Sequence, residues 1–239
     1  IGGQYAGLAG LVGIDLGTAS ANKTDLAIEV LKSRDFFRNF IATRELDAKL
    51  FAVKKWDQDN NEIIYDSKKY DYKNKKWLPN KKLDTHIAHK LWNDDILSIN
   101  KDVQTGFITI SIKHQSPELA YQILSLLLED IDDTLRSRDI ESASKAIEYL
   151  ENELIKTSSD DLRKLFFGII RDQTNKKMIA ITNPEYIFEI VDPPYKPEIK
   201  SEPKSLLILI SLTMLGFFIS IFYILIEKIL INKRKAHNG

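Results

Sequence analysis

An uncharged apolar run near the C-terminus constrains this chain more than any other feature. The run extends from Leu206 to Ile226 and contains no charged residue. As a helix it would be about 32 Å long at ~1.5 Å per residue, which is enough to cross a bilayer core of about 30 Å. The pattern therefore predicts a transmembrane helix over residues 205–227. The alternative is an apolar core helix of a large soluble protein.

The residues that flank this run predict its orientation. Four basic residues follow it closely, whereas the segment before it is mixed in sign. Basic residues next to a membrane helix favour the cytoplasmic side. We therefore expect residues 228–239 to form a cytoplasmic tail and the bulk of the chain to be extracytoplasmic. Because the sequence begins at Ile1 rather than Met, we also expect a fragment that lacks its N-terminus.

Composition excludes several classes of function. The chain has 34 basic and 34 acidic residues, so its balanced charge gives no electrostatic case for nucleic-acid binding. It contains no cysteine, which excludes disulfides and cysteine-ligated metal sites. The residues outside the apolar run are numerous enough to bury one substantial core.

The first 115 residues contain helical and strand patterns in succession, which predict the first part of an α/β base domain over residues 1–115. The predicted helices are Thr24–Ala42, Glu45–Val53 and Asp84–Asn93, and the predicted strands are Ile96–Ile99 and Gly106–His114.

Motifs that would carry catalysis or cofactor binding are weak. The glycines within residues 1–20 lack a preceding strand and a Gly-Lys-Ser/Thr sequence, so they do not predict a nucleotide-binding loop. His86 and His89 have the spacing of two ligands on one helix face, but no third metal ligand is evident nearby. We therefore expect no catalytic residue, no cofactor and no metal.

Residues 54–82 combine positive charge with aromatic side chains. Nine lysines against five acids give this segment a net charge of +4, and three tyrosines and two tryptophans are interleaved with them. One interpretation is a surface that stacks on sugar rings and attracts acidic groups. The other, which we favour, is a solvated insertion whose aromatic residues pack on the domain beneath.

The longest regular pattern predicts a helical hairpin over residues 116–182. Ser116 is a capping residue followed by Pro117 at the first helical position, and apolar periodicity then continues to about Lys156. A second stripe ends near Ala180 and predicts a shorter returning arm. The long arm is apolar on several sides at its start and has a narrower apolar stripe beyond Leu135, which indicates a base in a domain and a shaft that contacts one neighbour.

Residues 183–204 predict a closing strand, Tyr186–Val191, and a proline-rich linker. Pro194 and Pro197 have PxxP spacing, and Pro203 follows. Extended proline-rich structure is stiff, so the linker is either a rigid spacer or a docking segment for a partner protein.

The ordered segments SPELAYQILSLLLEDIDDTLRSRDIESASKAIEYLENEL, KKMIAI and YIFEIVDPPYKPEIKSEPK resemble the Wzz-type chain-length determinants. These are polysaccharide co-polymerases of Gram-negative inner membranes. The resemblance implies an α+β fold, with a membrane-proximal periplasmic α/β base domain, a long protruding helical hairpin and a C-terminal transmembrane helix. It also implies a first membrane helix that this sequence lacks.

By resemblance, the chain is a non-catalytic regulator of O-antigen (lipopolysaccharide) chain length. It would form a homo-oligomeric ring and act with an inner-membrane polymerase on lipid-linked polysaccharide. The family motif before and in the membrane helix falls on Pro194, Pro197, Pro203 and Gly216. The narrow stripe on the long arm suits contacts between protomers, at Leu135, Ile147, Leu150 and Leu154.

Two alternatives remain open at this point. One is a co-polymerase for enterobacterial common antigen, capsule or exopolysaccharide. Since 13 residues follow Ile226, we do not expect a fused kinase. The other alternative, from a different class, is an extracytoplasmic sensor domain whose output module would precede the sequence.

Overall fold

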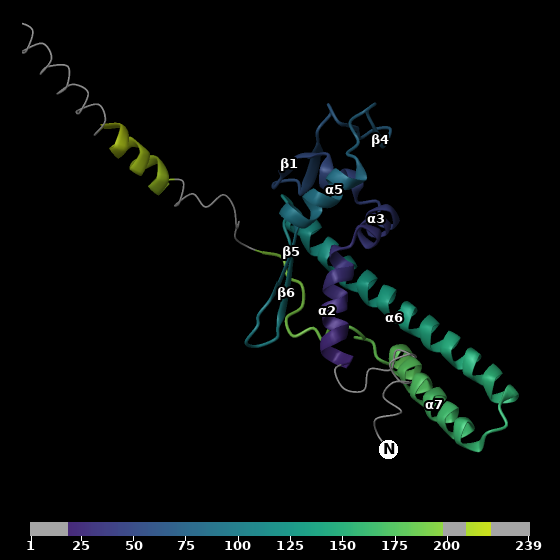
Figure 1. The fold of residues 1–239 in the computed structure, drawn as a ribbon. Coiled ribbons are helices and arrows are strands. Elements are labelled where there is room, and N and C mark those ends of the chain that lie inside the picture. The colour runs from purple at the N-terminus through teal and green to yellow at the C-terminus, as the bar shows by residue number, and fades with distance from the viewer. Residues whose placement is uncertain (1–18, 198–208, 221–239) are drawn as a thin grey trace, which may run out of the picture. The chain divides into compact units, whose positions relative to one another are not determined.

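The computed structural model describes residues 19–197 and 209–220 of the chain (Figure 1). The chain divides into two compact units, residues 1–196 and 197–239, which are described separately. The first unit has an α+β fold, as predicted. Its helices are α2 (Ala19–Lys32), α3 (Arg34–Thr43), α4 (Asp47–Phe51), α5 (Thr85–Leu91), the π-helical turn η1 (Trp92–Ile96), α6 (Pro117–Lys156) and α7 (Asp160–Thr182).

The described strands form three two-stranded antiparallel sheets. They are β1 (Val53–Asp57) with β2 (Glu62–Tyr65), β3 (Tyr70–Asp71) with β4 (Lys76–Trp77), and β5 (Leu97–Lys101) with β6 (Ile108–Ile112). The last pair confirms the two predicted strands, whereas the first two pairs, within residues 53–77, are strands that the sequence pattern does not predict.

The first predicted helix, Thr24–Ala42, is interrupted at Ser33. Ser33 has φ −70° and ψ 150°, and its side-chain oxygen accepts a hydrogen bond from the Phe36 amide. A serine hydroxyl satisfies a free amide at a helix start, so it favours ending one helix and beginning the next. The apolar periodicity continues through the break because α2 and α3 both contribute to the same core.

The base of α6 lies at the centre of the core. Leu119, Ile123, Leu127, Ile131 and Leu135 follow one another at intervals of four residues, and all five are buried. This spacing keeps them on one helix face, where residues of α2, α3, η1 and β5 surround them. The prediction that the start of the long arm is embedded in a domain is confirmed.

The three hairpins close with turns of the same design. Asp57, Asp71 and Asp102 each accept hydrogen bonds from the backbone amides two and three positions ahead. These donors favour the ionised carboxylate. The side chain of Asn60 is the main cause that lowers the pKa of Asp57, and that of Asn74 does the same for Asp71.

The residue that completes each of these turns has a left-handed backbone. Its φ is 52° at Asn61, 51° at Lys75 and 75° at Gly106. Asparagine and glycine adopt this region readily, whereas a lysine is strained there. Lys75 is therefore the one of these three positions that carries an unfavourable residue.

Replacing Lys75 with glycine is expected to raise the free energy of unfolding by about 1 kcal/mol, because it relieves the left-handed strain. Urea denaturation followed by far-UV circular dichroism measures the difference. Lys73, which lies in the same turn, is the matched control. Lys73→Gly should lower stability, since glycine there only adds flexibility to the unfolded chain. Equal losses in both variants would contradict the argument.

The predicted closing strand, Tyr186–Val191, is wrong, because residues 183–197 are irregular. The amides of Tyr186 and Ile187 both donate to Asp132 Oδ1 at 2.9 Å. These two backbone amides are therefore bonded to a side-chain carboxylate of α6 and are not free to pair with a neighbouring strand.

The predicted transmembrane helix over 205–227 is also wrong. In the second unit the structure describes a helix at residues 209–220, about 18 Å long at ~1.5 Å per residue. Within residues 19–197 and 209–220, no helix combines the length and the apolar character that a membrane crossing requires. The predicted inner-membrane location, with a periplasmic and a cytoplasmic part, depended on this transmembrane helix and is therefore not supported either. The predicted tail, 228–239, lies outside the described residues.

Candidate functional site

The α6–α7 hairpin is the feature that the sequence singled out, and the structure forms it as two antiparallel helices side by side (Figure 1). The arms have 40 and 23 residues. Ser159 caps α7 by accepting a hydrogen bond from the Leu162 amide. The long first arm and shorter second arm are as predicted.

The stripe predicted to contact other protomers is largely covered within the chain. Leu135, Leu150 and Leu154 are 4%, 4% and 9% exposed, and Ile147 is half-buried. Leu135 belongs to the core of the base, and the hairpin buries the two outer leucines. Three of the four side chains are thus not available to a second copy, because they already stabilise the single chain.

A different stripe on the hairpin is exposed. Phe167, Met178 and Ile181 of α7 are 55%, 56% and 59% exposed. Phe167 and Met178 each precede a buried residue, Ile169 and Ala180, by two positions. Two positions correspond to about 200° around a helix. Phe167 and Met178 therefore lie on the side of α7 opposite to the side that buries Ile169 and Ala180. We call these three residues the α7 stripe.

A polar network holds the C-terminal end of α7 on α6. The Arg136 guanidinium donates to the carbonyls of Ala180, Asn183 and Pro184 at 2.6, 2.6 and 2.9 Å. It also pairs with Asp132, at 2.5 Å. The last carbonyls of a helix have no partner within the helix, and Arg136 supplies one from the opposite arm.

A second set of contacts continues this network toward α2. The Tyr186 hydroxyl donates to Asp139 at 2.6 Å, and the ammonium of Lys23 donates to the same hydroxyl at 2.6 Å. Burial alone would raise the pKa of Asp139, but the hydrogen bonds from Tyr186 and Lys176 outweigh it and lower that pKa. Burial, together with the bond to Asp139, raises the pKa of Tyr186, so its hydroxyl stays protonated as a donor.

The segment DTLRSRDIESA, which is part of the first stretch that resembles the chain-length determinants, supplies the centre of these contacts. It contains Arg136 and Asp139, together with Ala143, which is fully buried. In the sequence these charged residues interrupt the apolar stripe of the long arm. Asp132, Arg136 and Asp139 are spaced so that they lie on one helix face, and this spacing predicts that their side chains share one network.

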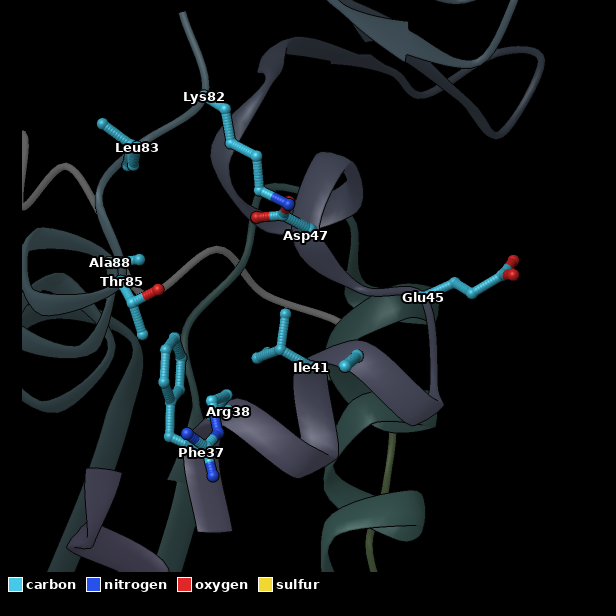
Figure 2. A pocket seen from close by; sticks show the side chains of 10 residues that line it. Phe37, Arg38, Ile41, Glu45, Asp47, Lys82, Leu83, Thr85 and Ala88 are labelled. Carbon is cyan, nitrogen blue, oxygen red and sulfur yellow. The ribbon is translucent and has the colours of Figure 1, made fainter. Parts of the chain in front are cut away.

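The hollow shown in Figure 2 has a volume of about 280 Å³. Phe37, Ile41 and Ala88 contribute to its apolar lining. At its edge Lys82 points toward Asp47, with 2.7 Å between their charged atoms, whereas Glu45 points away (Figure 2). The lining is thus apolar with an ion pair at the edge, and it offers no pair of groups arranged for acid–base chemistry.

The two histidines considered as metal ligands have other partners. His86 Nδ1 lies 3.2 Å from an Arg34 nitrogen, and His89 Nε2 lies 2.8 Å from the Lys32 carbonyl oxygen at the end of α2. Among the described residues, no group of three potential metal ligands is brought together.

His114 links α4 to the start of α6 and is expected to make stability depend on pH. Its Nε2 donates to the Lys49 carbonyl, and its Nδ1 accepts from the Ser116 amide. Burial lowers the pKa of His114, so the native state favours the neutral ring. This contribution to stability is complete above the unfolded pKa of about 6.5 and is lost as the pH falls through the lower folded value.

Melting temperatures measured between pH 8 and pH 5 test this expectation. The wild-type protein should lose more stability over this interval than His114→Gln, whose side chain does not titrate. Parallel pH profiles in the two proteins would show that His114 does not cause the dependence.

The predicted proline motif is only partly described. Pro194 is half-buried and Pro197 is exposed, whereas Pro203 lies outside the described residues. Lys196, between the first two, forms an ion pair with Glu118 and lies 5.5 Å from the centre of the Tyr121 ring. Gly216 lies within the helix at 209–220, with open space where a Cβ would be. Of the four motif residues, the structure thus describes Pro194, Pro197 and Gly216, each by itself.

No protein-family model matches the sequence, and no curated protein matches it significantly. The resemblance to chain-length determinants therefore rests on the quoted segments and on the elements that they form.

Proposed function

We propose that this protein is a non-catalytic regulator of polysaccharide chain length, which acts with a polysaccharide polymerase on lipid-linked O-antigen. The observation that carries the proposal is the α6–α7 hairpin. Its long arm begins in the core of an α+β base and continues for 40 residues, about 60 Å at ~1.5 Å per residue. The segment DTLRSRDIESA, which carries part of the resemblance, lies where this arm leaves the base, and its Arg136 binds the Ala180 carbonyl near the end of α7.

The α7 stripe supports assembly into a homo-oligomeric ring. A soluble chain gains little from exposing large apolar residues along one helix face, and such a face is typical of contacts between proteins. Phe167, Met178 and Ile181 meet this description, whereas the buried residues of α6 do not. A second copy of the chain is the proposed partner, because a ring needs a surface that each protomer repeats.

Deletion of the gene in the encoding strain tests the proposed function. Lipopolysaccharide from the wild type should give a ladder with a narrow, preferred length on a gel. The deletion should replace it with a broad distribution of short chains, and the full-length gene on a plasmid should restore the preferred length. An unchanged ladder after deletion would contradict the proposal.

The α7 stripe gives a separate prediction for assembly. The double variant Phe167→Glu, Met178→Glu is expected to shift the full-length protein from an oligomer to a monomer, since charges on this face repel and resist burial. Size-exclusion chromatography with light scattering measures the mass. Asp172→Lys, at a residue whose side chain is 51% exposed and which lies about 140° around the same helix from Phe167, is the matched control and should leave the mass unchanged. A monomeric wild type, or an oligomeric double variant, would exclude this interface.

A further inference from the structure

The two hairpins β1–β2 and β3–β4 carry a row of aromatic rings that leads from the core to the solvent. Trp77 packs against the core, and its ring centre lies 5.6 Å from that of Tyr70. Tyr70 lies 5.5 Å from Tyr65, which lies 5.2 Å from Tyr72. Tyr65 and Tyr72 are stacked with an angle of 16° between their planes, and Tyr72 is 66% exposed. The row therefore packs on the core at Trp77 and is exposed to solvent at Tyr72.

Exposed lysines lie in the same segment of the chain as this row, and most of them are not ion-paired. In the described part of the chain Lys82 is ion-paired with Asp47, whereas the remaining lysines of the segment form no ion pair. Three of the five acids are engaged by backbone amides of the turns, at Asp57, Asp66 and Asp71. The exposed lysines without an ion pair are Lys54, Lys55, Lys68, Lys69, Lys73, Lys75, Lys76 and Lys81. We call these lysines, with Tyr65, Tyr70, Tyr72 and Trp77, the hairpin platform.

Lys75 adds an independent observation at the tip of the second hairpin. The corresponding turn positions of the other hairpins carry Asn61 and Gly106, which suit a positive φ, whereas Lys75 has φ 51°. A costly conformation at an exposed tip is compatible with a role of the side chain outside folding, although the exposed Glu45 has a similar φ of 50°.

We propose that the hairpin platform is a binding site for an acidic polysaccharide. This rests on the proposed function, in which a glycan is the substrate of the partner polymerase. The slightly positive C–H faces of sugar rings fit the negative face of an exposed aromatic ring, which Tyr72 provides at the open end of the row. Carboxylates along the glycan would pair with the lysine ammonium groups, which the net charge of +4 on residues 54–82 favours. The neutral charge of the whole chain makes nucleic acid a poorer fit.

Calorimetric titration of the full-length protein with polygalacturonate oligomers tests this site. Binding is expected at low salt, with much weaker binding of neutral dextran oligomers of equal length. Tyr72→Ala should weaken the binding about fivefold. The triple variant Lys73→Gln, Lys75→Gln, Lys76→Gln should weaken it about tenfold. Lys90→Gln, at an exposed lysine of α5, is the matched control and should bind as the wild type does.

Lys75→Gly separates binding from folding, because it should stabilise the hairpin and still lose affinity. Three results would overturn the proposal: no binding of polygalacturonate, equal binding of dextran, or equal binding of a single-stranded oligonucleotide or of anionic phospholipid vesicles with the same response to the variants. The lipopolysaccharide ladder is a separate readout. If the protein does not bind polygalacturonate but gene deletion alters the ladder, the binding site is refuted and the proposed function stands. If the protein binds polygalacturonate but gene deletion leaves the ladder unchanged, the proposed function is refuted and the binding site stands.

Discussion

Replacing Arg136 with methionine is expected to lower the free energy of unfolding by about 3–5 kcal/mol. The Arg136 side chain is 19% exposed, and its guanidinium is shared between the Asp132 carboxylate and the carbonyls of Ala180 in α7 and of Asn183 and Pro184 just after it. Methionine fills a similar volume but donates no hydrogen bond. The carboxylate would then keep only the amides of Tyr186 and Ile187 as partners, and the end of α7 would detach from α6.

Two variants distinguish the network from the charge alone. Arg136→Lys should cost less than methionine but still destabilise, because an ammonium cannot reach a carboxylate and three carbonyls in the planar geometry of a guanidinium. Arg138→Met, two positions along α6 at an exposed arginine, should change stability by less than about 0.5 kcal/mol. Urea denaturation followed by circular dichroism at 222 nm measures all three. A loss below about 1 kcal/mol for Arg136→Met would show that the network does not hold the hairpin.

The elements that the sequence predicted well are those with local signals at both ends. Ser116 caps α6 through the Leu119 amide, Pro117 occupies its first position, and no glycine or proline interrupts it. The strands β5 and β6 alternate apolar and polar residues across a short connection, a pattern that hairpins share. These features depend on residues close in sequence and are readable without the fold.

The errors arise where distant residues compete for the same groups. The segment Tyr186–Val191 has the composition of a strand, but Asp132, more than fifty positions earlier, accepts its first amides. The break at Ser33 is local, yet the apolar period continues across it and hides it. The apolar run near the C-terminus suggested a length of helix that the described residues do not contain.

The candidate site was predicted in outline but not in detail. The periodicity of apolar residues predicted an apolar stripe on the long arm. It could not predict whether another helix of the same chain covers that stripe. The shorter arm covers Leu150 and Leu154, and the hairpin instead exposes apolar residues such as Phe167 and Met178 of α7. For residues 54–82 the favoured interpretation is confirmed in part, since Trp77 packs on the core, whereas Tyr72 at the other end of the row is exposed. Binding of sugar rings by this segment stays a prediction.

Replacing Trp92 with alanine is expected to lower the free energy of unfolding by about 3–5 kcal/mol. Trp92 is 1% exposed, and its ring centre lies 5.9 Å from those of both Phe37 and Phe40. It begins the π-helical turn that joins α5 to β5, so it packs α3 against the start of the third sheet. Alanine would leave a large cavity between rings that cannot all move to fill it. Thermal and urea denaturation measure the loss, and Leu91→Ala, at a neighbour that is 36% exposed, should cost much less.

Trp92→Phe makes the argument sharper, because the indole N–H is buried and has no hydrogen-bond partner in the described part of the chain. An unsatisfied buried donor costs about 1–3 kcal/mol, and phenylalanine removes it together with one ring. The smaller cavity and the removed donor then oppose each other, so the net loss should stay below about 1.5 kcal/mol. If Trp92→Phe costs as much as Trp92→Ala, the shape of the indole rather than its aromatic area holds the core. The unpaired N–H would then be a tolerated consequence of that shape.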